Sequence, residues 1–212
     1  MLLNLQHVVR PPRSAGPAPH PTLLLLHGLG ADENDLIELA GELDPGLFVV
    51  SARAPFRYVI GYAWYSLESI GEVEPKTFAT GFARLSQFVD ALPAAYPVDP
   101  RRFFTLGFSQ GAVMASALLL TRPSVVAGSI LLSGYLPDNL RLNVDAAGLV
   151  GRPVFLGHGA QDPLISVDLA RKMRDYLVRA GVDLTYREYA IVHTIGPEEL
   201  SDLAAWLGNR MH

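Results

Sequence analysis

The chain of 212 residues contains no cysteine. Disulfide bonds, thiolate metal sites and cysteine nucleophiles are therefore excluded, so any nucleophile must be a different side chain. The chain also lacks an apolar run close to the ~20 residues of a membrane span. Residues 1–10 contain no basic leader followed by a longer apolar segment. We expect a cytoplasmic protein with no stable membrane insertion.

Charged residues are few as well: they make up 18% of the chain, the formal net charge is −4, and no long basic run occurs. Because nucleic acids and anionic membranes are bound by concentrated positive surfaces, neither is an expected partner. Half of the residues are hydrophobic, which is typical of a packed globular enzyme. A chain of this length suits one well-buried core, so we expect a single domain over residues 1–212, as a monomer or a weak homodimer.

Short apolar runs recur along the chain and predict strands. They lie at about residues 2–9, 22–26, 47–51, 102–108, 128–132, 153–157 and 184–189, the last more polar and typical of an edge. Apolar residues at helical spacing predict helices at about 34–43, 77–92, 113–120, 167–180 and 198–207. This alternation implies right-handed crossovers and a doubly wound, mostly parallel α/β sheet with helices on both faces.

A nucleophile motif lies at one strand-to-helix junction. Gly107-Phe108-Ser109-Gln110-Gly111 has the form G-x-S-x-G and falls between the strand 102–108 and an apolar helix. In so sharp a turn the serine backbone is strained and the glycines let strand and helix approach closely, so the hydroxyl projects above the sheet. This context predicts that Ser109 is the nucleophile of an α/β-hydrolase fold rather than a serine in a surface turn. The N–H of Gln110, at the helix start, is the nearest oxyanion donor.

A serine hydroxyl needs a base to take its proton during attack. In this fold the chain order is serine, acid, histidine, which leaves His158, His193 and His212 after Ser109. His193 follows the last predicted strand and precedes the last predicted helix, so a loop can carry it over the carboxyl ends of the strands. We predict His193 as the base. His158 ends a buried strand and is more simply explained as a hydrogen-bonded structural residue, and His212 is terminal.

The acid that orients the histidine should be a carboxylate in a loop after a strand. Asp162 follows the strand 153–157, and the next residue, Pro163, keeps it extended and out of the following helix. Asp162 is therefore the predicted acid. Asp138, after the preceding strand, is the rival, whereas Asp168 at a helix start is explained by the helix dipole.

A second motif, His27-Gly28-Leu29-Gly30, follows the first central strand, where hydrolases of this fold supply their other oxyanion N–H. We predict Leu29 as that donor. The stretch begins like a dinucleotide fingerprint, but Glu33 occupies the place of the last glycine, and the acidic pair 32–33 would repel a pyrophosphate. No H-x-x-x-H or H-E-x-x-H spacing occurs, so no metal site is predicted.

Taken together, the segments 25–30, 107–112 and 158–165 and the late His193 resemble the phospholipase/carboxylesterase family, which includes acyl-protein thioesterases and small bacterial carboxylesterases. The likeness runs from about residue 22 to residue 207. It implies a cofactor-free esterase with Ser109, His193 and Asp162 as its triad and the N–H groups of Leu29 and Gln110 as its oxyanion hole. One departure lies at residues 190–194, where the family usually has a glycine just before its histidine and this chain has none.

About twenty residues separate the predicted strands 128–132 and 153–157, too few for a helical lid, so we expect an open site. The expected acyl groove is lined by Trp64, Leu67, Val113, Leu164 and Ile165. The predicted function is a carboxylesterase acting on short to medium acyl or aromatic esters, which are small-molecule partners. The alternatives are an acyl-protein thioesterase or lysophospholipase, with the same machinery, and a non-catalytic binding protein of the same fold.

Overall fold

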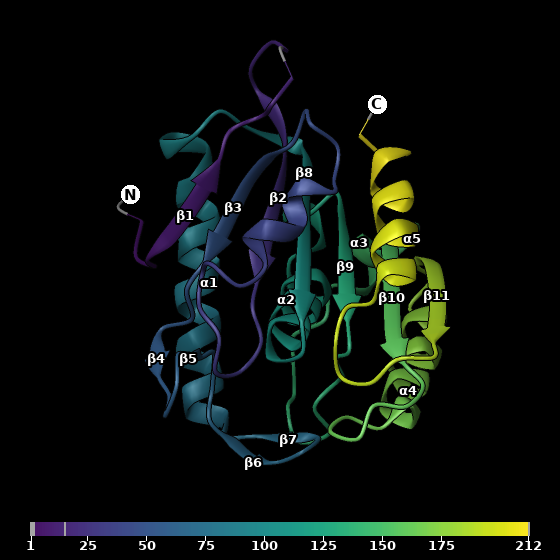
Figure 1. Cartoon of the computed structure of the whole chain (residues 1–212). Coiled ribbons are helices and arrows are strands. Elements are labelled where there is room, and N and C mark those ends of the chain that lie inside the picture. The colour runs from purple at the N-terminus through teal and green to yellow at the C-terminus, as the bar shows by residue number, and fades with distance from the viewer. Residues whose placement is uncertain (1–2, 15, 212) are drawn as a thin grey trace.

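A seven-stranded sheet forms the centre of the computed structural model, which describes residues 3–14 and 16–211. In spatial order its strands are β1 (His7–Arg10), β3 (Phe48–Ala52), β2 (His20–Leu26), β8 (Val98–Phe108), β9 (Gly128–Leu132), β10 (Pro153–Gly159) and β11 (Asp183–Tyr189). β1 pairs antiparallel with β3, and the other neighbours pair in parallel. The carboxyl ends of six strands therefore meet at one edge, the lower edge in Figure 1.

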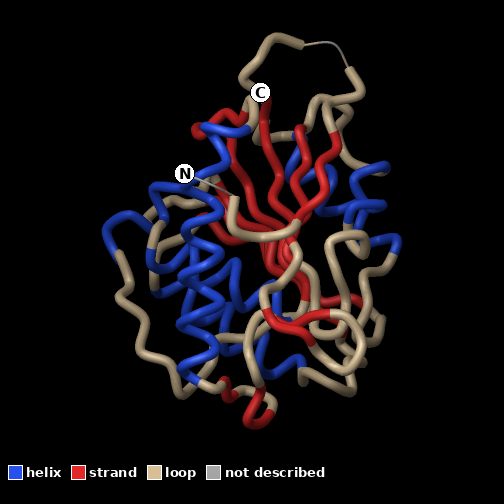
Figure 2. Tube along the Cα trace, turned by 90° about the vertical axis from the view of Figure 1, so that its left-hand side faces the viewer, coloured by secondary structure: helices blue, strands red, loops and turns tan. Residues whose placement is uncertain are grey.

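Helices cover both faces of this sheet. One face carries α1 (Pro75–Ala95), α2 (Gln110–Thr121), α4 (Val167–Arg179) and the short α3 (Ala146–Leu149). The other carries η1 (Ile37–Gly41) and α5 (Pro197–Gly208). Figure 2 shows the sheet between these layers, the first of which is the thicker. Successive residues of β2 point to opposite cores, and all of residues 22–26 are buried. A continuous apolar run is what a strand covered on both faces requires.

The seven predicted strands are all present, with ends shifted by a few residues, except that the first begins only at His7; position 2 lies outside the described residues. Four of the five predicted helices are present too. The helix α1 extends beyond the predicted 77–92, because Pro75 can occupy a first turn and the Glu74 carboxylate caps the N–H groups of Lys76 and Thr77.

The predicted α-helix at 34–43 is wrong. That segment contains only the 3₁₀ helix η1, preceded by turns. Leu36, Ala40 and Leu43 are buried as a helical period requires, but the N–H of Leu39 bonds to the carbonyl of Leu36, which is the tighter 3₁₀ spacing. The preceding residues are fixed by tertiary contacts, since Glu33 pairs with Arg53, so regular helix does not form there.

Two short hairpins lie beyond the carboxyl ends of the central strands and were not predicted. They are β4 (Phe56–Arg57) with β5 (Tyr62–Ala63), and β6 (Leu67–Ser69) with β7 (Glu72–Val73). The second crosses the bottom of the molecule in Figure 1. Residues 133–152, which join β9 to β10 and are all described by the structure, form one short helix, α3, so no helical lid is inserted there, as expected. The remaining short element is η2 (Pro123–Val125).

Candidate active site

Ser109 occupies a sharp turn between β8 and α2. Its φ of 54° and ψ of −117° place a non-glycine residue in a strained region. Both flanking glycines are required by close approach: a Cβ at Gly107 would meet the carbonyl of Gly111, and a Cβ at Gly111 would meet the carbonyl of Leu26 on β2. Strand and helix thus touch through backbone atoms, and this packing holds the serine in its strained conformation.

The Ser109 hydroxyl begins a chain of hydrogen bonds. His193 Nε2 lies 3.0 Å from Ser109 Oγ, and His193 Nδ1 lies 2.6 Å from Asp162 Oδ2. Because a carboxylate only accepts, Nδ1–H donates to Asp162 and leaves Nε2 free to accept the serine proton. The other carboxylate oxygen accepts the N–H groups of Leu164 and Ile165, each at 2.9 Å. The carboxylate is buried and fixed from both sides, so it holds the imidazole in one orientation.

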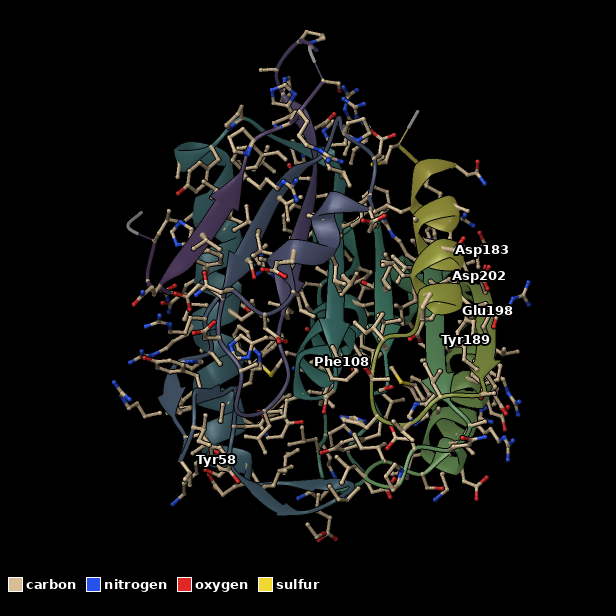
Figure 3. The ribbon with its side chains drawn as sticks, in the orientation of Figure 1. Tyr58, Phe108, Asp183, Tyr189, Glu198 and Asp202 are labelled. Carbon is tan, nitrogen blue, oxygen red and sulfur yellow. The ribbon has the colours of Figure 1, made fainter. Side chains whose placement is uncertain are left out.

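His193 reaches this position from the loop between β11 and α5. Its ring packs against Phe108, with centroids 4.9 Å apart, and Phe108 lies at the end of β8 in Figure 3. The loop crosses Gly159 so closely that a Cβ there would meet the carbonyls of residues 191 and 192. Tyr189, the last residue of β11, fixes the start of the loop, because its hydroxyl donates a hydrogen bond to Asp202 on α5 at 2.8 Å. The family usually has a glycine just before the histidine. This chain has none there, and its loop instead passes close over Gly159.

Among the described residues, none of the rivals is hydrogen-bonded to Ser109 or His193. Asp138 borders a separate groove beside α4, and Asp168 pairs with Arg171 at 3.0 Å. His158 Nε2–H donates to the Ile165 carbonyl at 2.8 Å and lies 3.6 Å from Asp162 Oδ2. Burial lowers the pKa of His158, so it is a neutral support of the loop that carries Asp162. His212 lies outside the described residues.

Leu29 and Gln110 both line the pocket that contains Ser109. Within residues 3–14 and 16–211, neither N–H donates a hydrogen bond. The Gln110 side chain accepts the N–H of Trp64 and donates to the carbonyl of Tyr65, each at 3.0 Å. This clamp ties the start of α2 to the segment after β5, a role that the sequence did not suggest. Backbone N–H groups that make no other hydrogen bond are the kind of donor that can stabilise an oxyanion.

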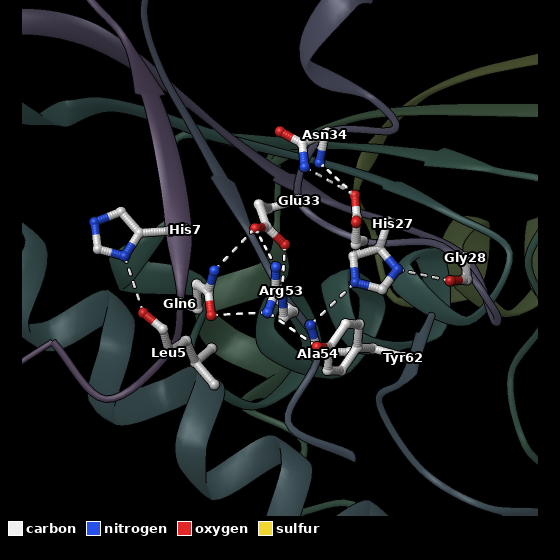
Figure 4. A network of polar contacts seen from close by, with 11 residues as sticks. Leu5, Gln6, His7, His27, Gly28, Glu33, Asn34, Arg53, Ala54 and Tyr62 are labelled. Atoms are coloured by element: carbon white, nitrogen blue, oxygen red, sulfur yellow. Dashed lines mark hydrogen bonds and ion pairs between the residues drawn. The ribbon is translucent and has the colours of Figure 1, made fainter. Parts of the chain in front are cut away.

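His27 fixes the direction of the Leu29 N–H through its contacts with Gly28 and Ala54, which are drawn in Figure 4. The N–H of Ala54 donates to His27 Nε2 at 3.0 Å, so the ring proton is on Nδ1, which donates to the Gly28 carbonyl at 2.7 Å. That carbonyl belongs to the same planar peptide as the Leu29 N–H, and the two point in opposite directions. Burial lowers the pKa of His27 and keeps it neutral. Holding one end of the peptide therefore aims the other.

An ion pair anchors the next turn of this loop. Arg53 donates to both oxygens of Glu33, at 2.5 and 2.6 Å, and also to Gln6 and to the hydroxyl of Tyr62. The Glu33 side chain is nearly fully buried. Figure 4 shows that the partners of Arg53 belong to separate segments of the chain. The position where a dinucleotide-binding loop would need glycine is thus occupied by a structural carboxylate.

The pocket over Ser109 has a volume of about 310 Å³. Of the predicted groove residues, Leu67, Leu164 and Ile165 line it. Trp64 and Val113 do not: both are fully buried, and the Trp64 Nε1–H donates to the His27 carbonyl at 2.9 Å. Four further lining residues were not predicted as site residues, namely Gly28, Ile70, Phe108 and Tyr135. Phe108 lay inside the elbow motif, and Tyr135 follows a strand that ends at this edge, so the signal for both was present in the sequence.

Among the described residues, no group of three His, Asp or Glu side chains converges as a metal site would require. The described part of the chain also has no helix that is both long enough and apolar enough to cross a bilayer.

Comparison with known proteins agrees with this architecture. The model of the Phospholipase/Carboxylesterase family matches residues 7–210. Acyl-protein thioesterase 1 of Candida albicans is 27% identical over 210 residues, covering 88% of this chain and 90% of its own. The crystal structure of a carboxylesterase from Mesorhizobium loti superposes with a TM-score of 0.86 at 25% identity, covering 97% and 95% of the two chains. That of esterase PE8 gives 0.84 at 27% identity, covering 97% and 99%.

Proposed function

The chain belongs to the phospholipase/carboxylesterase family of α/β-hydrolases, and from that premise we propose that it hydrolyses carboxylic esters of short to medium acyl chains or aromatic acids. The observation that carries the proposal is the unbroken hydrogen-bonded chain from Ser109 through His193 to Asp162, beside two unpaired N–H groups. Ser109 and Asp162 each lie within hydrogen-bonding distance of His193, and this supports an acyl-transfer site.

In the proposed reaction Ser109 Oγ attacks the ester carbonyl while His193 Nε2 takes its proton. The carbonyl oxygen becomes an oxyanion held by the N–H groups of Leu29 and Gln110. The tetrahedral intermediate collapses, His193 gives the proton to the departing alcohol, and an acyl-serine remains. Water, deprotonated by His193, then attacks the acyl-serine, and His193 returns the proton to Ser109 Oγ as the carboxylic acid is released.

The size and chemistry of the pocket support the proposed substrate class. Its volume of about 310 Å³ is near the lower end of ligand pockets in general. Its walls include Leu67, Ile70 and Leu164, and the last two are 52% and 60% exposed. An apolar pocket with exposed walls suits a short or medium acyl chain or one aromatic ring.

Thioester hydrolysis is a second candidate, favoured by the similarity to an acyl-protein thioesterase. It would use the same nucleophile, base and oxyanion donors, so the site geometry alone favours neither. A panel of p-nitrophenyl esters from acetate to palmitate, run beside acyl thioesters of the same lengths and hydroxycinnamate esters, decides between them by kcat/KM.

Covalent labelling tests the proposed nucleophile. A fluorophosphonate should label the parent protein at Ser109, and Ser109→Ala should abolish labelling and lower kcat by at least about a thousandfold while the fold is retained. Circular dichroism supplies the control for folding. Activity within tenfold of the parent in Ser109→Ala would overturn the assignment.

A further inference from the structure

A second pocket, larger than the one over Ser109, lies between α4 and residues 136–144. We call it the α4 groove. Its volume is about 580 Å³, well within the range of small-molecule sites. It shares no lining residue with the pocket over Ser109, although Leu136 of the groove directly follows Tyr135 of that pocket. The groove is therefore separate from the proposed active site, although the two pockets are lined by consecutive residues of one segment.

The floor of the α4 groove is apolar. Met173 on α4 and Leu120 on α2 are buried beneath it, and Leu169 and Tyr176 extend the same face of α4 at helical spacing. On the opposite side the 136–144 segment contributes leucines and Val144, which is 37% exposed. A hydrated ion or a sugar gains nothing from such a surface, whereas an alkyl chain gains by leaving water.

The rim of the groove is positively charged. Arg141, Lys172 and Arg179 border it, against the single carboxylate of Asp138. Over residues 3–14 and 16–211, none of these three cations forms an ion pair. The two acidic residues of α4 are paired elsewhere: Asp168 with Arg171 and Asp175 with Arg174. Although the protein has a net charge of −4, these three exposed cations give the rim of the apolar groove a local positive charge that would attract an anion.

We propose that the α4 groove binds a free medium-chain carboxylate, with its alkyl chain on the Met173 and Leu169 floor and its carboxylate between Lys172 and Arg179. Lys172 and Arg179 stand seven residues apart on one helix, so they face the same side of it. The choice of a carboxylate rests on the proposed function, since ester hydrolysis at Ser109 would release such a molecule next to the groove. Binding itself requires no catalysis.

Calorimetric titration of decanoate into the Ser109→Ala protein tests this proposal. We expect saturable binding that weakens at least about tenfold with butyrate, which lacks the chain, and with methyl decanoate, which lacks the charge. Lys172→Glu and Arg179→Glu should each weaken decanoate binding at least about tenfold. Arg84→Glu is the matched control: it makes the same charge change at an exposed position on α1 and should bind as the parent does.

A decanoate carrying a diazirine then locates the site. Crosslinks mapped by mass spectrometry should fall in residues 136–144 and 169–179. Crosslinks confined to residues around Ser109, or equal binding by Lys172→Glu and Arg84→Glu, would overturn the proposal. Binding to phosphatidylglycerol vesicles without binding of monomeric decanoate would overturn it in favour of a membrane-docking face.

The failure of this proposal is distinguishable from failure of the proposed function. Esterase activity is measured on the parent and on Lys172→Glu, which should stay within about twofold of each other, because Lys172 does not touch the pocket over Ser109. If the parent is inactive on esters but still binds decanoate in the groove, the proposed function is contradicted and the proposed binding site is not.

Discussion

His27 shows how a single imidazole can act on chemistry that it does not touch. Its Nδ1–H holds the Gly28 carbonyl and its Nε2 accepts the Ala54 N–H. Two substitutions can remove these contacts one at a time. In His27→Asn the amide nitrogen can take the place of Nδ1, and in His27→Gln the amide oxygen can take the place of Nε2. Only the first contact orients the peptide that carries the Leu29 N–H.

We therefore predict that His27→Gln lowers kcat on p-nitrophenyl butyrate by about tenfold to a hundredfold with little change in KM, since an oxyanion donor is misaligned. His27→Asn should stay within about fivefold of the parent. A trifluoromethyl ketone, whose hemiketal oxyanion needs the same donor, should lose affinity in proportion to kcat. If both variants lose activity to the same extent as they lose thermal stability, His27 only supports the fold.

Glu199 on α5 carries a carboxyl group that is buried in the core. Its side chain is fully buried on α5 against Gly157, and neither oxygen accepts a hydrogen bond of normal geometry within the described residues. Burial raises the pKa of Glu199 from 4.5 to about 7. The folded protein thus holds a proton that the unfolded chain releases, so the contribution of Glu199 to folding stability is fully present below pH 4.5 and is lost as the pH rises through about 7.

The predicted size of this loss is about 3 kcal/mol, from a shift of roughly two and a half units at 1.36 kcal/mol per unit. Glu199→Gln cannot ionise, so its free energy of unfolding relative to the parent should rise by that order between pH 5 and pH 8 in urea titrations. Glu198→Gln, one position earlier and exposed, is the control and should follow the parent at both pH values. Parallel curves for Glu199→Gln and the parent would contradict the prediction.

At the scale of elements, the elbow depends on three backbone segments meeting without side chains between them. α2 rests on β2 through Gly111, and β8 rests on α2 through Gly107. The carbonyls opposite these glycines are backbone atoms of buried elements and do not swing aside as a flexible side chain would. The glycines of the motif therefore serve packing as much as the turn itself.

Gly111→Ala should destabilise the protein by about 3 kcal/mol through overpacking, which for a chain of this size lowers Tm by roughly 6–12 °C. Activity should fall as well, because the shift moves Ser109 and the Gln110 N–H. Gly208→Ala is the matched control: the space around Gly208 is open, and its Tm should change by less than about 2 °C. Scanning calorimetry and an esterase assay on both variants measure the effects. If Gly111→Ala has the same Tm as Gly208→Ala, then α2 can move away from β2 at little cost in stability.

For the whole molecule, the two cores lie on opposite faces of one sheet and share its strands. Trp64 belongs to the core under α1 and α2, and Trp206 belongs to the core under α5, where it packs against Phe104 and Phe155. A strand such as β2 supplies alternate residues to both, so neither core can be lost while the other stays intact. We propose that the chain unfolds as a single domain.

The prediction uses the two tryptophans as separate reporters. In Trp64→Phe the remaining fluorescence reports the α5 face, and in Trp206→Phe it reports the α1 face. In each variant the urea midpoint by fluorescence should coincide with the midpoint by far-UV circular dichroism, as a two-state transition requires. Two separated midpoints within one variant would mean that the faces unfold independently.

Much of this protein was determined by local sequence pattern. The continuous apolar run at 22–26 specified a strand buried on both faces, and G-x-S-x-G between a strand and an apolar helix specified the elbow. The candidate triad was predictable because Ser109, Asp162 and His193 each follow a strand, and parallel strands deliver their carboxyl ends to one edge. Periodicity and chain order carry this information without any knowledge of packing.

Only the tertiary structure decided where certain side chains go. Trp64 and Val113 were predicted to line the groove, yet both turn into the core, and the Trp64 ring nitrogen bonds to the His27 carbonyl from a distant segment. The predicted helix at 34–43 gave way to turns and a 3₁₀ helix, after a loop that the Glu33 to Arg53 ion pair holds. A local pattern fixes the period of the backbone, but the destination of a side chain depends on contacts between residues far apart in the chain, which the pattern does not encode.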